Sequence, residues 1–349
     1  MRGQRLVSVL LDHLIWFLLL AIVIFFALTT RNFLTRANFI NVLFNASVLG
    51  VLVIGQSFTL FTGNFDLSAE STLGLCGLLG IFFITRAGPP LYGSGLLLSP
   101  WIALLLTHLV GLAIGWVNGV LITKMRVNNF VVTLAMLITV RGVTLLVNNG
   151  QTAYSSSPAY NWLGLAKLGP VPVPVVVFLL LFGLGNLVMA RTRFGRELYA
   201  IGANRNAALA SGVRPERRII QVYMLSGLLA AFAGWMLSAR LTNAMSSMGK
   251  GMIFEVFAAA VIGGVSLKGG QGSLLGALGG VLLLTTIGAG LNLMDVSVYW
   301  VQAIRGLIIL VAMIIEAQKS RVARAVARQE GARGAHPGGT GSAAGLSGA

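Results

Sequence analysis

The chain has 349 residues, of which 56% are hydrophobic and only 10% are charged. Because soluble domains carry about 25% charged residues, this composition excludes an ordinary water-soluble protein and indicates one whose outer surface faces lipid. The net charge of +16 does not indicate a nucleic-acid partner, because the basic residues separate long apolar runs instead of forming a face on a soluble module. One cysteine and three scattered histidines exclude a disulfide framework and disfavour a metal site, so no metal ligand is assigned.

Ten segments along the chain are long and apolar enough to be membrane-spanning helices, each of which needs about 20 predominantly apolar residues. The sequence therefore predicts an all-α, polytopic integral membrane protein with about ten transmembrane helices. Gly-rich runs interrupt two regions, near residues 63–71 and 252–273, and these are expected to be broken or re-entrant. In chain order the predicted spans are 14–30, two spans within 39–86 on either side of the first break, 100–122, 129–147, 171–190, 219–241, 252–267, 272–293 and 298–317.

The distribution of Lys and Arg between these spans predicts the orientation of the chain. With the N terminus in the cytoplasm, the segments on the inside carry 17 basic residues and those on the outside carry 5. This difference satisfies the positive-inside rule and places both termini in the cytoplasm. The predicted organisation is a cytoplasmic N-terminal segment (1–13), a transmembrane domain (14–317), and a basic and then disordered cytoplasmic tail (318–349).

The segment 191–218 is the longest polar stretch between predicted spans and holds seven basic residues. Charge alone allows a plain solvated loop. The alanines within 207–210 favour a short helix, however, which Asn204 can cap at its start and Gly212 can end in the left-handed conformation. A short helix with small side chains on a cytoplasmic loop is a shape that can dock into a groove on another protein.

The chain also carries a series of short motifs, each weak alone, in a fixed order between the predicted spans. They are Gly63–Ser68, Asn129–Leu134, Phe194–Arg196, Tyr199–Asn204, Ala207-Ala208 with Ser211-Gly212, Val261–Leu267 running into Gly269–Ser273, and Arg305–Ile309. Over residues 33–316 this order resembles the permease subunits of bacterial ATP-binding-cassette importers for ribose, arabinose, xylose and galactose. The branched-chain amino acid permeases of the same superfamily are a nearby rival, but the contexts of Asp66 and Ser266 look closer to the sugar group.

The resemblance implies a membrane-spanning permease subunit of the bacterial inner membrane that translocates a monosaccharide or related small polyol delivered by a periplasmic binding protein. It also implies a second permease copy, in a homodimer or a heterodimer. In that family the loop matching 191–218 forms the coupling helix that seats in a cytoplasmic ATPase subunit. ATP and Mg are expected on that partner and no cofactor on this chain, which lacks a Gly-x-x-x-x-Gly-Lys-(Ser/Thr) loop and is not expected to be an enzyme. By this resemblance the coupling residues are Arg196, Asn204, Ala207, Ala208 and Gly212.

The sequence departs from the family pattern at Asn64, where a glycine is usual, and at Ala69 and Glu70, where valine and glycine are usual. These differences leave the identity of the substrate open. A carboxylate at Glu70 beside a helix break is costly unless it is paired or wet. It either alters the substrate preference or lies in a hydrated opening.

Polar side chains within or near the predicted breaks are candidates for holding the broken helices or facing the translocation pathway, because irregular backbone at membrane depth is tolerated only where protein covers it or it lines a cavity. Asp66 precedes a helix and can accept hydrogen bonds from free amides, a structural role that is favoured over substrate contact. The two breaks have similar Gly-rich patterns, which indicates a weak internal repeat. The candidates are Asp66, Ser68, Glu70, Glu255, Ser266 and Gln302.

Two other classes of protein stay open at this point. An ion-coupled secondary transporter would need intramembrane acids as ion or proton carriers, and the chain offers only Asp66, Glu70, Glu255 and Asp295. A membrane-embedded enzyme would need a catalytic constellation within the spans, and the sequence shows none.

Overall fold

The computed structural model describes residues 14–297, 299–304, 306–308, 310–311 and 314. It is 73% helical, and strands of only two residues occur among the described residues, so the predicted all-α class is confirmed. The helices are α2 (Leu14–Thr29), α3 (Arg36–Phe61), α4 (Ala69–Ile84), α5 (Pro100–Thr123), α6 (Asn129–Val147), α7 (Pro158–Leu165), α8 (Val173–Arg191), α9 (Arg193–Ala203), α10 (Arg205–Ala210), α11 (Pro215–Leu241), α12 (Met252–Ile262) and α13 (Leu274–Leu293). The strands β1 (Ala153–Tyr154) and β4 (Asn243–Ala244) pair antiparallel, as do β2 (Lys167–Leu168) and β3 (Val171–Pro172).

Among the described residues, six helices are long and apolar enough to cross a membrane, namely α3, α5, α6, α8, α11 and α13. Three more helices, α2, α4 and α12, are apolar but shorter. In chain order these helices correspond to the predicted spans from the first to the ninth. The tenth predicted span lies partly outside the described residues. The predicted segments 1–13 and 318–349 lie wholly outside them.

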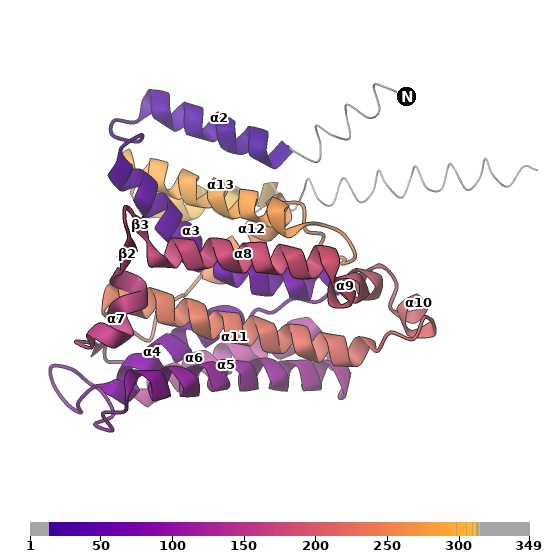
Figure 1. Ribbon diagram of the computed structural model, residues 1–349, viewed down its shortest axis with the longest axis horizontal. Helices are drawn as coiled ribbons and strands as arrows, with labels where there is room; N and C mark the ends of the chain where they lie inside the picture. Colours follow the sequence, from indigo (N-terminus) through magenta and orange to yellow (C-terminus); the bar gives the residue numbers. More distant parts are fainter. Residues whose placement is uncertain (1–13, 298, 305, 309, 312–313, 315–349) are drawn as a thin grey trace, which may run out of the picture.

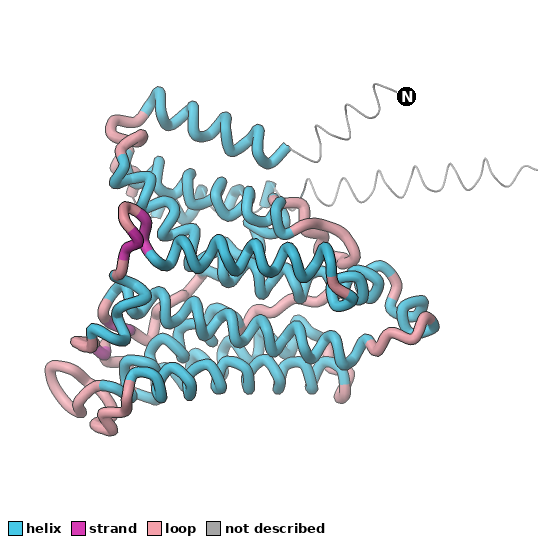
Figure 2. The backbone as a smooth tube through the Cα atoms, viewed as in Figure 1, coloured by secondary structure: helices cyan, strands magenta, loops and turns pink. Residues whose placement is uncertain are grey.

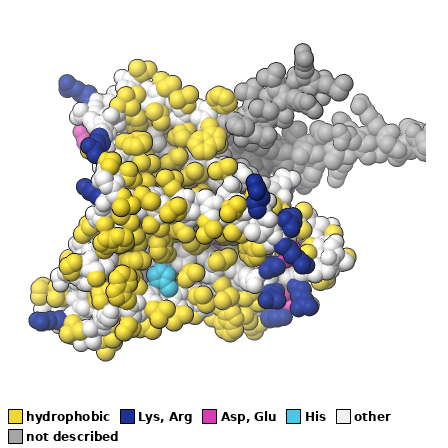
Figure 3. Space-filling model, viewed as in Figure 1, with side chains coloured by type: hydrophobic (Ala, Val, Ile, Leu, Met, Phe, Trp, Pro, Cys, Tyr) yellow, Lys and Arg dark blue, Asp and Glu magenta, His cyan; other side chains and the backbone are white. Residues whose placement is uncertain are grey.

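The spanning helices lie beside one another, and the connecting segments gather at two ends of the bundle (Figures 1 and 2). One end carries α7 and the β2–β3 hairpin, and the other, called here the α9–α10 end, carries α9 and α10 (Figure 1). Hydrophobic side chains cover the face between the two ends, while Lys and Arg gather at the ends themselves (Figure 3). Because such a surface suits lipid tails and not water, the chain is a multi-pass membrane protein.

The helical structure is interrupted in both predicted regions. α3 ends at Phe61, and a non-helical stretch, 62–68, precedes α4. α11 ends at Leu241, a non-helical stretch, 242–251, follows, and α12 then has only 11 residues. A helix of that length extends about 16 Å, roughly half the thickness of a hydrocarbon layer. Both predicted regions therefore contain a break, at 62–68 in the first and at 263–273, after α12, in the second. The stretch 242–251 is an additional break, which precedes the second predicted region.

The succession of long helix, break and short helix occurs twice, in opposite directions. α3 runs toward the α9–α10 end, because the carbonyl of its last residue, Phe61, lies against Gly202 of α9. α11 starts at that end, since it follows α10 closely in the chain. This arrangement is an inverted repeat of the kind that builds many transporters. The repeat predicted from the Gly-rich patterns paired 63–71 with 261–273. In the structure the stretch equivalent to 62–68 is instead 242–251, because each of these two follows a long helix, whereas 263–273 follows the short helix α12.

α11 lies at the centre of the bundle, where it packs against α3, α4, α5 and α7. Its contact with α5 is close because α5 places Gly111, Gly115 and Gly119 one turn apart on the face that meets α11. A β-carbon at Gly115 would overlap the carbonyl oxygen of Tyr223, and one at Gly111 would overlap that of Gly227. The small residues therefore allow the two backbones to approach each other and gain dispersion contacts that lipid tails cannot provide.

Replacing Gly115 with leucine is expected to destabilise the fold by about 3 kcal/mol, because the new side chain has to displace the backbone of α11. Gly142→Leu is the matched control, since Gly142 lies on α6 and a β-carbon there meets no atom within 4 Å. Thermal unfolding of both variants in detergent measures the difference. Equal unfolding temperatures for the two variants would contradict this account of the α5–α11 contact.

Candidate functional site

The first break is held by hydrogen bonds around Asp66, whose side chain is buried with 1% exposure. Its Oδ1 atom accepts from the backbone N of Ser68 at 3.0 Å and from the Ser68 hydroxyl at 2.6 Å. Its Oδ2 atom accepts from the hydroxyl of Ser226 on α11 at 2.8 Å. Asn118 of α5 donates to the Ser68 oxygen at 2.8 Å. Asp66 thus accepts from backbone at the start of α4, as predicted, and both acid and serine point into the bundle.

The backbone of this break also finds its partners inside the protein. The hydroxyl of Tyr223 on α11 donates to the carbonyl of Phe65 at 2.9 Å. Gln56 of α3, in the amide orientation that satisfies both of its ends, donates to the carbonyl of Asp66 at 3.0 Å and accepts from its N–H at 3.2 Å. Asn64, which replaces a glycine of the family pattern, accepts at 3.2 Å from Asn129 of α6. The break is therefore a stable, covered feature, as irregular backbone at membrane depth has to be.

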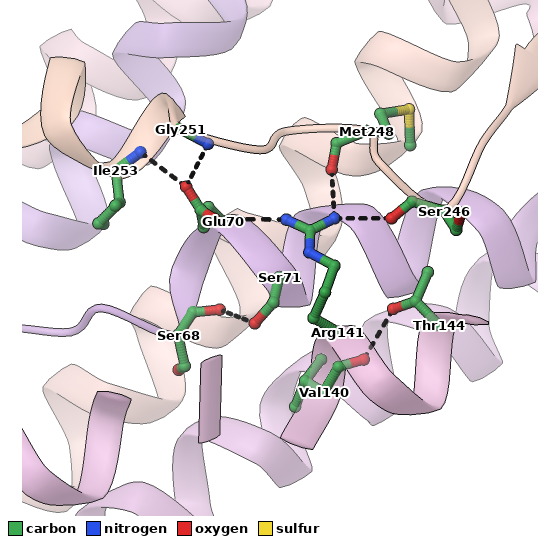
Figure 4. Close-up of polar contacts among 10 residues, drawn as sticks. All are labelled: Ser68, Glu70, Ser71, Val140, Arg141, Thr144, Ser246, Met248, Gly251 and Ile253. Carbon is green, nitrogen blue, oxygen red and sulfur yellow. Dashed lines mark hydrogen bonds and ion pairs between the residues drawn. The ribbon is translucent and has the colours of Figure 1, made fainter. Parts of the chain in front are cut away.

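Glu70 joins the two short helices to each other (Figure 4). It lies in the first turn of α4 with 5% exposure, and its Oε2 atom accepts from the backbone N–H groups of Gly251 at 2.8 Å and of Ile253 at 3.2 Å, at the start of α12. Its Oε1 atom pairs with Arg141 of α6 at 3.4 Å. Glu70 therefore lies in a buried, paired environment and not in a hydrated opening.

The physical reason for this contact is the uncapped start of α12. The N-cap residue is Gly251, with φ 85°, so no side chain of its own can accept from the first amides. The Glu70 carboxylate, from α4, accepts from these amides instead. It therefore lies near the positive end of the helix dipole of both α4 and α12. Arg141 neutralises the carboxylate and donates to the carbonyls of Ser246 at 2.9 Å and Met248 at 2.8 Å, within the non-helical stretch before α12.

Arg141 was not predicted as a site residue, although its position inside a predicted span is a signal. A charged residue inside a predicted span requires a partner or a cavity, and Glu70 was the nearest unexplained acid of opposite charge. What the sequence did not show is that the stretch 242–251 would return into the bundle and supply both carbonyl acceptors for Arg141 and amide donors for Glu70.

Removing either member of the Glu70–Arg141 pair is expected to cost about 3–5 kcal/mol, because the other member is left buried without its partner. The double variant Glu70→Ala/Arg141→Ala should be more stable than the sum of the two single changes predicts. Lys124→Ala is the control, since Lys124 pairs with Glu216 at 2.7 Å on an exposed surface and such pairs contribute about 1 kcal/mol or less. Thermal unfolding of the four variants measures these losses of stability. The pairing role would be refuted if the loss in the double variant equalled the sum of the two single losses, or if each single loss were as small as that of Lys124→Ala.

The non-helical stretch 263–273, which follows α12, lies at the α9–α10 end, against α3 and α9. The backbone N–H of Gly270 donates to the carbonyl of Phe61 at 3.0 Å, and the hydroxyl of Tyr199 on α9 donates to the carbonyl of Gly272 at 2.9 Å. Ser266 is buried, and its hydroxyl oxygen accepts from the N–H of Lys268 at 3.2 Å. Ser266 therefore shapes this turn and does not line an opening.

Glu255 lies apart from these residues, on the wall of a cavity of about 410 Å³ between α3, α11, α12 and α13. The same wall carries the polar side chains of Asn45, Arg240, Thr285 and Asn292. Gln302 is exposed on the helical segment 299–304. The predicted pathway residues therefore lie at two buried breaks, in one cavity and, for Gln302, on the surface, and the structure does not gather them at a single site.

The segment 191–218 forms α9 and α10, as the predicted docking helix requires. The Oδ1 atom of Asn204 accepts from the N–H groups of Asn206 and Ala207, each at 3.0 Å, and caps α10. At the other end Gly212 has φ 81° and donates to the carbonyl of Leu209 at 3.0 Å. Both predicted caps of this short helix are confirmed.

The two alanines of the predicted coupling motif face opposite ways. Ala207 is exposed, whereas Ala208 is buried in a cluster with Ile201, Ile219 and Tyr223. Arg196 is exposed on α9. Ala207 and Arg196 are thus open to a partner, while Ala208 fixes α10 to α9 and α11.

An ion-pair cluster ties α9 to the start of α11. Glu197 is paired with Arg218 of α11 and, at 2.6 Å, with Arg193 of its own helix. The hydrogen bond from Arg218 is the main reason why the pKa of Glu197 is lowered from its ordinary value, with Arg193 adding to the effect. The carboxylate is therefore held in its charged form at neutral pH.

The stability that this cluster contributes is expected to disappear in acid. With the folded-state pKa of Glu197 below the unfolded value of about 4.3, the contribution is fully present above that value and is lost as pH falls through the folded pKa. The unfolding temperature of the wild type should exceed that of Glu197→Gln at pH 7, by an amount equivalent to ~1 kcal/mol or less because water screens the pair, and the difference should vanish near pH 3. A difference that persists unchanged at pH 3 would exclude this titration as its cause.

A membrane bundle with two broken helices in an inverted repeat and a docking helix at one end has the architecture of a transport permease. Within the described residues, no group of three or more His, Cys, Asp or Glu side chains is placed to hold a metal ion. The family model described as "Branched-chain amino acid transport system / permease component" matches residues 38–313, and the chain belongs to this family.

Individual relatives cover most of the chain. It is 34% identical over 304 residues to the ribose import permease protein of Bacillus subtilis (strain 168), a match that covers 86% of this chain and 91% of that protein. It is 33% identical over 305 residues to the ribose import permease protein of Escherichia coli (strain K12), with 86% and 92% covered. It is 34% identical over 303 residues to the L-arabinose transport system permease protein of Escherichia coli (strain K12), with 86% and 88% covered. No solved structure matches the chain.

Proposed function

We propose that this chain is the membrane-spanning permease subunit of an ATP-driven importer for a monosaccharide or a related small polyol. The relatives named for ribose import and L-arabinose transport support the substrate class. We place the protein in the bacterial inner membrane with both termini in the cytoplasm. The Lys and Arg side chains at the α9–α10 end support this orientation, because positively charged residues are retained on the cytoplasmic side (Figure 3).

The observation that carries the proposal is a series of direct contacts from α10 to the first break. Ala208 of α10 packs in one cluster with Tyr223 of α11. The Tyr223 hydroxyl bonds the carbonyl of Phe65, and Ser226, one turn further along α11, bonds Asp66. A movement of α10 driven by a partner is therefore passed to the broken helix by packing and hydrogen bonds.

α9 provides a second connection, to the stretch 263–273. Its Tyr199 hydroxyl bonds the carbonyl of Gly272, and its Gly202 lies so close to Gly270 and to the carbonyl of Phe61 that a β-carbon would not fit. The segment 191–218 thus contacts the stretch 263–273 directly and the first break through Tyr223 of α11. A permease needs such connections if the work of a separate ATPase is to open and close its pathway.

The partners follow from the surfaces that the bundle leaves open. The exposed Ala207 and Arg196 are proposed to contact a cytoplasmic ATPase subunit, which binds ATP and Mg and performs the hydrolysis. The opposite end, with α7, is proposed to receive a periplasmic substrate-binding protein. α6 is only 22% buried over its apolar window, which supports contact with a second permease copy in a homodimer or a heterodimer.

The cavity beside Glu255 supports a polyol as the transported molecule. Amide, hydroxyl and charged side chains share its wall with apolar groups, a mixture that suits the hydroxyls and the carbon skeleton of a sugar. We propose Glu255 as the residue of this cavity that faces the pathway. Asp66, Ser68, Glu70 and Ser266 are proposed to hold the broken helices.

Ala207→Trp is expected to lower sugar uptake and ATPase stimulation at least tenfold in reconstituted vesicles, because the exposed methyl group becomes too large to seat in the partner. Its unfolding temperature should stay that of the wild type. Ala208→Trp should instead lower the unfolding temperature, since Ala208 is buried. Leu180→Trp, at an exposed position on α8 between the two ends, is the control for a surface tryptophan. Undiminished uptake by Ala207→Trp would refute the coupling role of α10.

A further inference from the structure

A large groove lies at the α9–α10 end, between α5, α10 and α11. Its volume is about 790 Å³. Its outer part is cationic, with Lys124, Arg205, Arg214 and Arg217 on the wall and Glu216 as the one carboxylate among the residues that line it. Its inner part is apolar and includes Trp116 and Met224.

Three of the four groove cations, the arginines, form no ion pair with a carboxylate of the described chain. Glu216 is occupied by Lys124, at 2.7 Å. The other ion pairs at this end of the described chain join Glu197 to Arg193 and Arg218, so that Arg205, Arg214 and Arg217 belong to none of them. Arg205 is within electrostatic range of Glu216, and Arg214 and Arg217 also line a small pocket with Glu197, but positive charge exceeds negative charge around the groove. Arginines in such a surplus suit a phosphate, which they bind with paired, charge-assisted hydrogen bonds.

The apolar part of the groove extends into the membrane layer. Trp116 precedes the end of α5, at Thr123, by about 10 Å of helix, and Met224 lies about 13 Å beyond the start of α11 at Pro215. Trp116 is 51% exposed, and it continues the lipid-facing apolar surface of α5 that includes Leu109. A protein that docks from water onto the helix ends does not reach this depth, whereas a lipid chain does.

We propose that this groove binds an anionic glycerophospholipid from the leaflet at the α9–α10 end. Its phosphate lies among Arg205, Arg214 and Arg217, and one acyl chain lies along Trp116 and Met224. Basic pockets between spanning helices at a cytoplasmic face are known to select such head groups. Because α10 forms one wall, a bound lipid braces the docking helix against α5 and α11. The inference requires only that the bundle lies in a membrane, and it holds whatever the chain transports.

The test uses the full-length protein in neutral detergent, titrated with dioleoyl phosphatidylglycerol or dioleoyl phosphatidylcholine and followed by native mass spectrometry. The wild type should retain phosphatidylglycerol at least tenfold more tightly than phosphatidylcholine. Arg214→Gln/Arg217→Gln should weaken phosphatidylglycerol binding about 30-fold. The control Arg191→Gln/Arg196→Gln removes the same charge from exposed positions outside the groove and should weaken it less than threefold.

Several results would overturn the proposal. Equal retention of both lipids by the wild type excludes selection by charge, and equal loss in the control pair shows only a general effect of net charge. Binding of soluble glycerol 3-phosphate as tight as that of the lipid assigns the groove to a free phosphate. Loss of ATPase-subunit binding in Arg214→Gln/Arg217→Gln, with lipid binding unchanged, assigns it to the protein partner. If the double variant fails to fold, Arg205→Gln replaces it, with an expected loss of about fivefold.

Discussion

Backbone that leaves the helical conformation inside a membrane has to find every hydrogen-bond partner within the protein, and the arrangement of this bundle depends on how that requirement is met. The largest single share falls on Glu70 and Arg141. The carboxylate accepts from the two amides at the start of α12, and the guanidinium donates to two carbonyls of the stretch before it. One ion pair thus allows a half-length helix to begin in the middle of the apolar layer, with α4 and α12 held start to start.

The first break meets the same requirement by other means, and the difference has a functional consequence. Its partners are neutral side chains from α3, α5, α6 and α11, and one of them, Tyr223, also packs in one cluster with Ala208 of α10. α10 is therefore connected to the break at Asp66 through a single residue of α11. The Glu70–Arg141 pair contacts neither α9 nor α10. The bundle thus combines a junction tied to α10 with one that keeps the two short helices in register.

Much of this fold was predictable because membrane spans are specified by length and hydropathy alone, and the caps of α10 by the local chemistry of Asn204 and Gly212. Tertiary packing decided the rest. That Ala208 is buried and Ala207 exposed depends on where α11 lies beside α10. The stretch 242–251 is polar and Gly-containing, so its sequence is typical of an exposed loop, and only the carbonyl acceptors that it offers Arg141 explain why it enters the bundle. The glycines of α5 were a readable signal, because their spacing of four is that of a close helix contact.

Two of the three departures from the family pattern, those at positions 64 and 70, have a common explanation. Asn64 and Glu70 each replace a glycine that has no side chain to offer, and each uses its new side chain to bind α6, Asn64 through Asn129 and Glu70 through Arg141. Neither lines the cavity that contains Glu255. Their effect is therefore to attach the first break and the start of α4 to α6 at two points. Since α6 is the least buried of the six long candidate spans, these attachments hold in place a helix that has few packing contacts with the rest of the described chain.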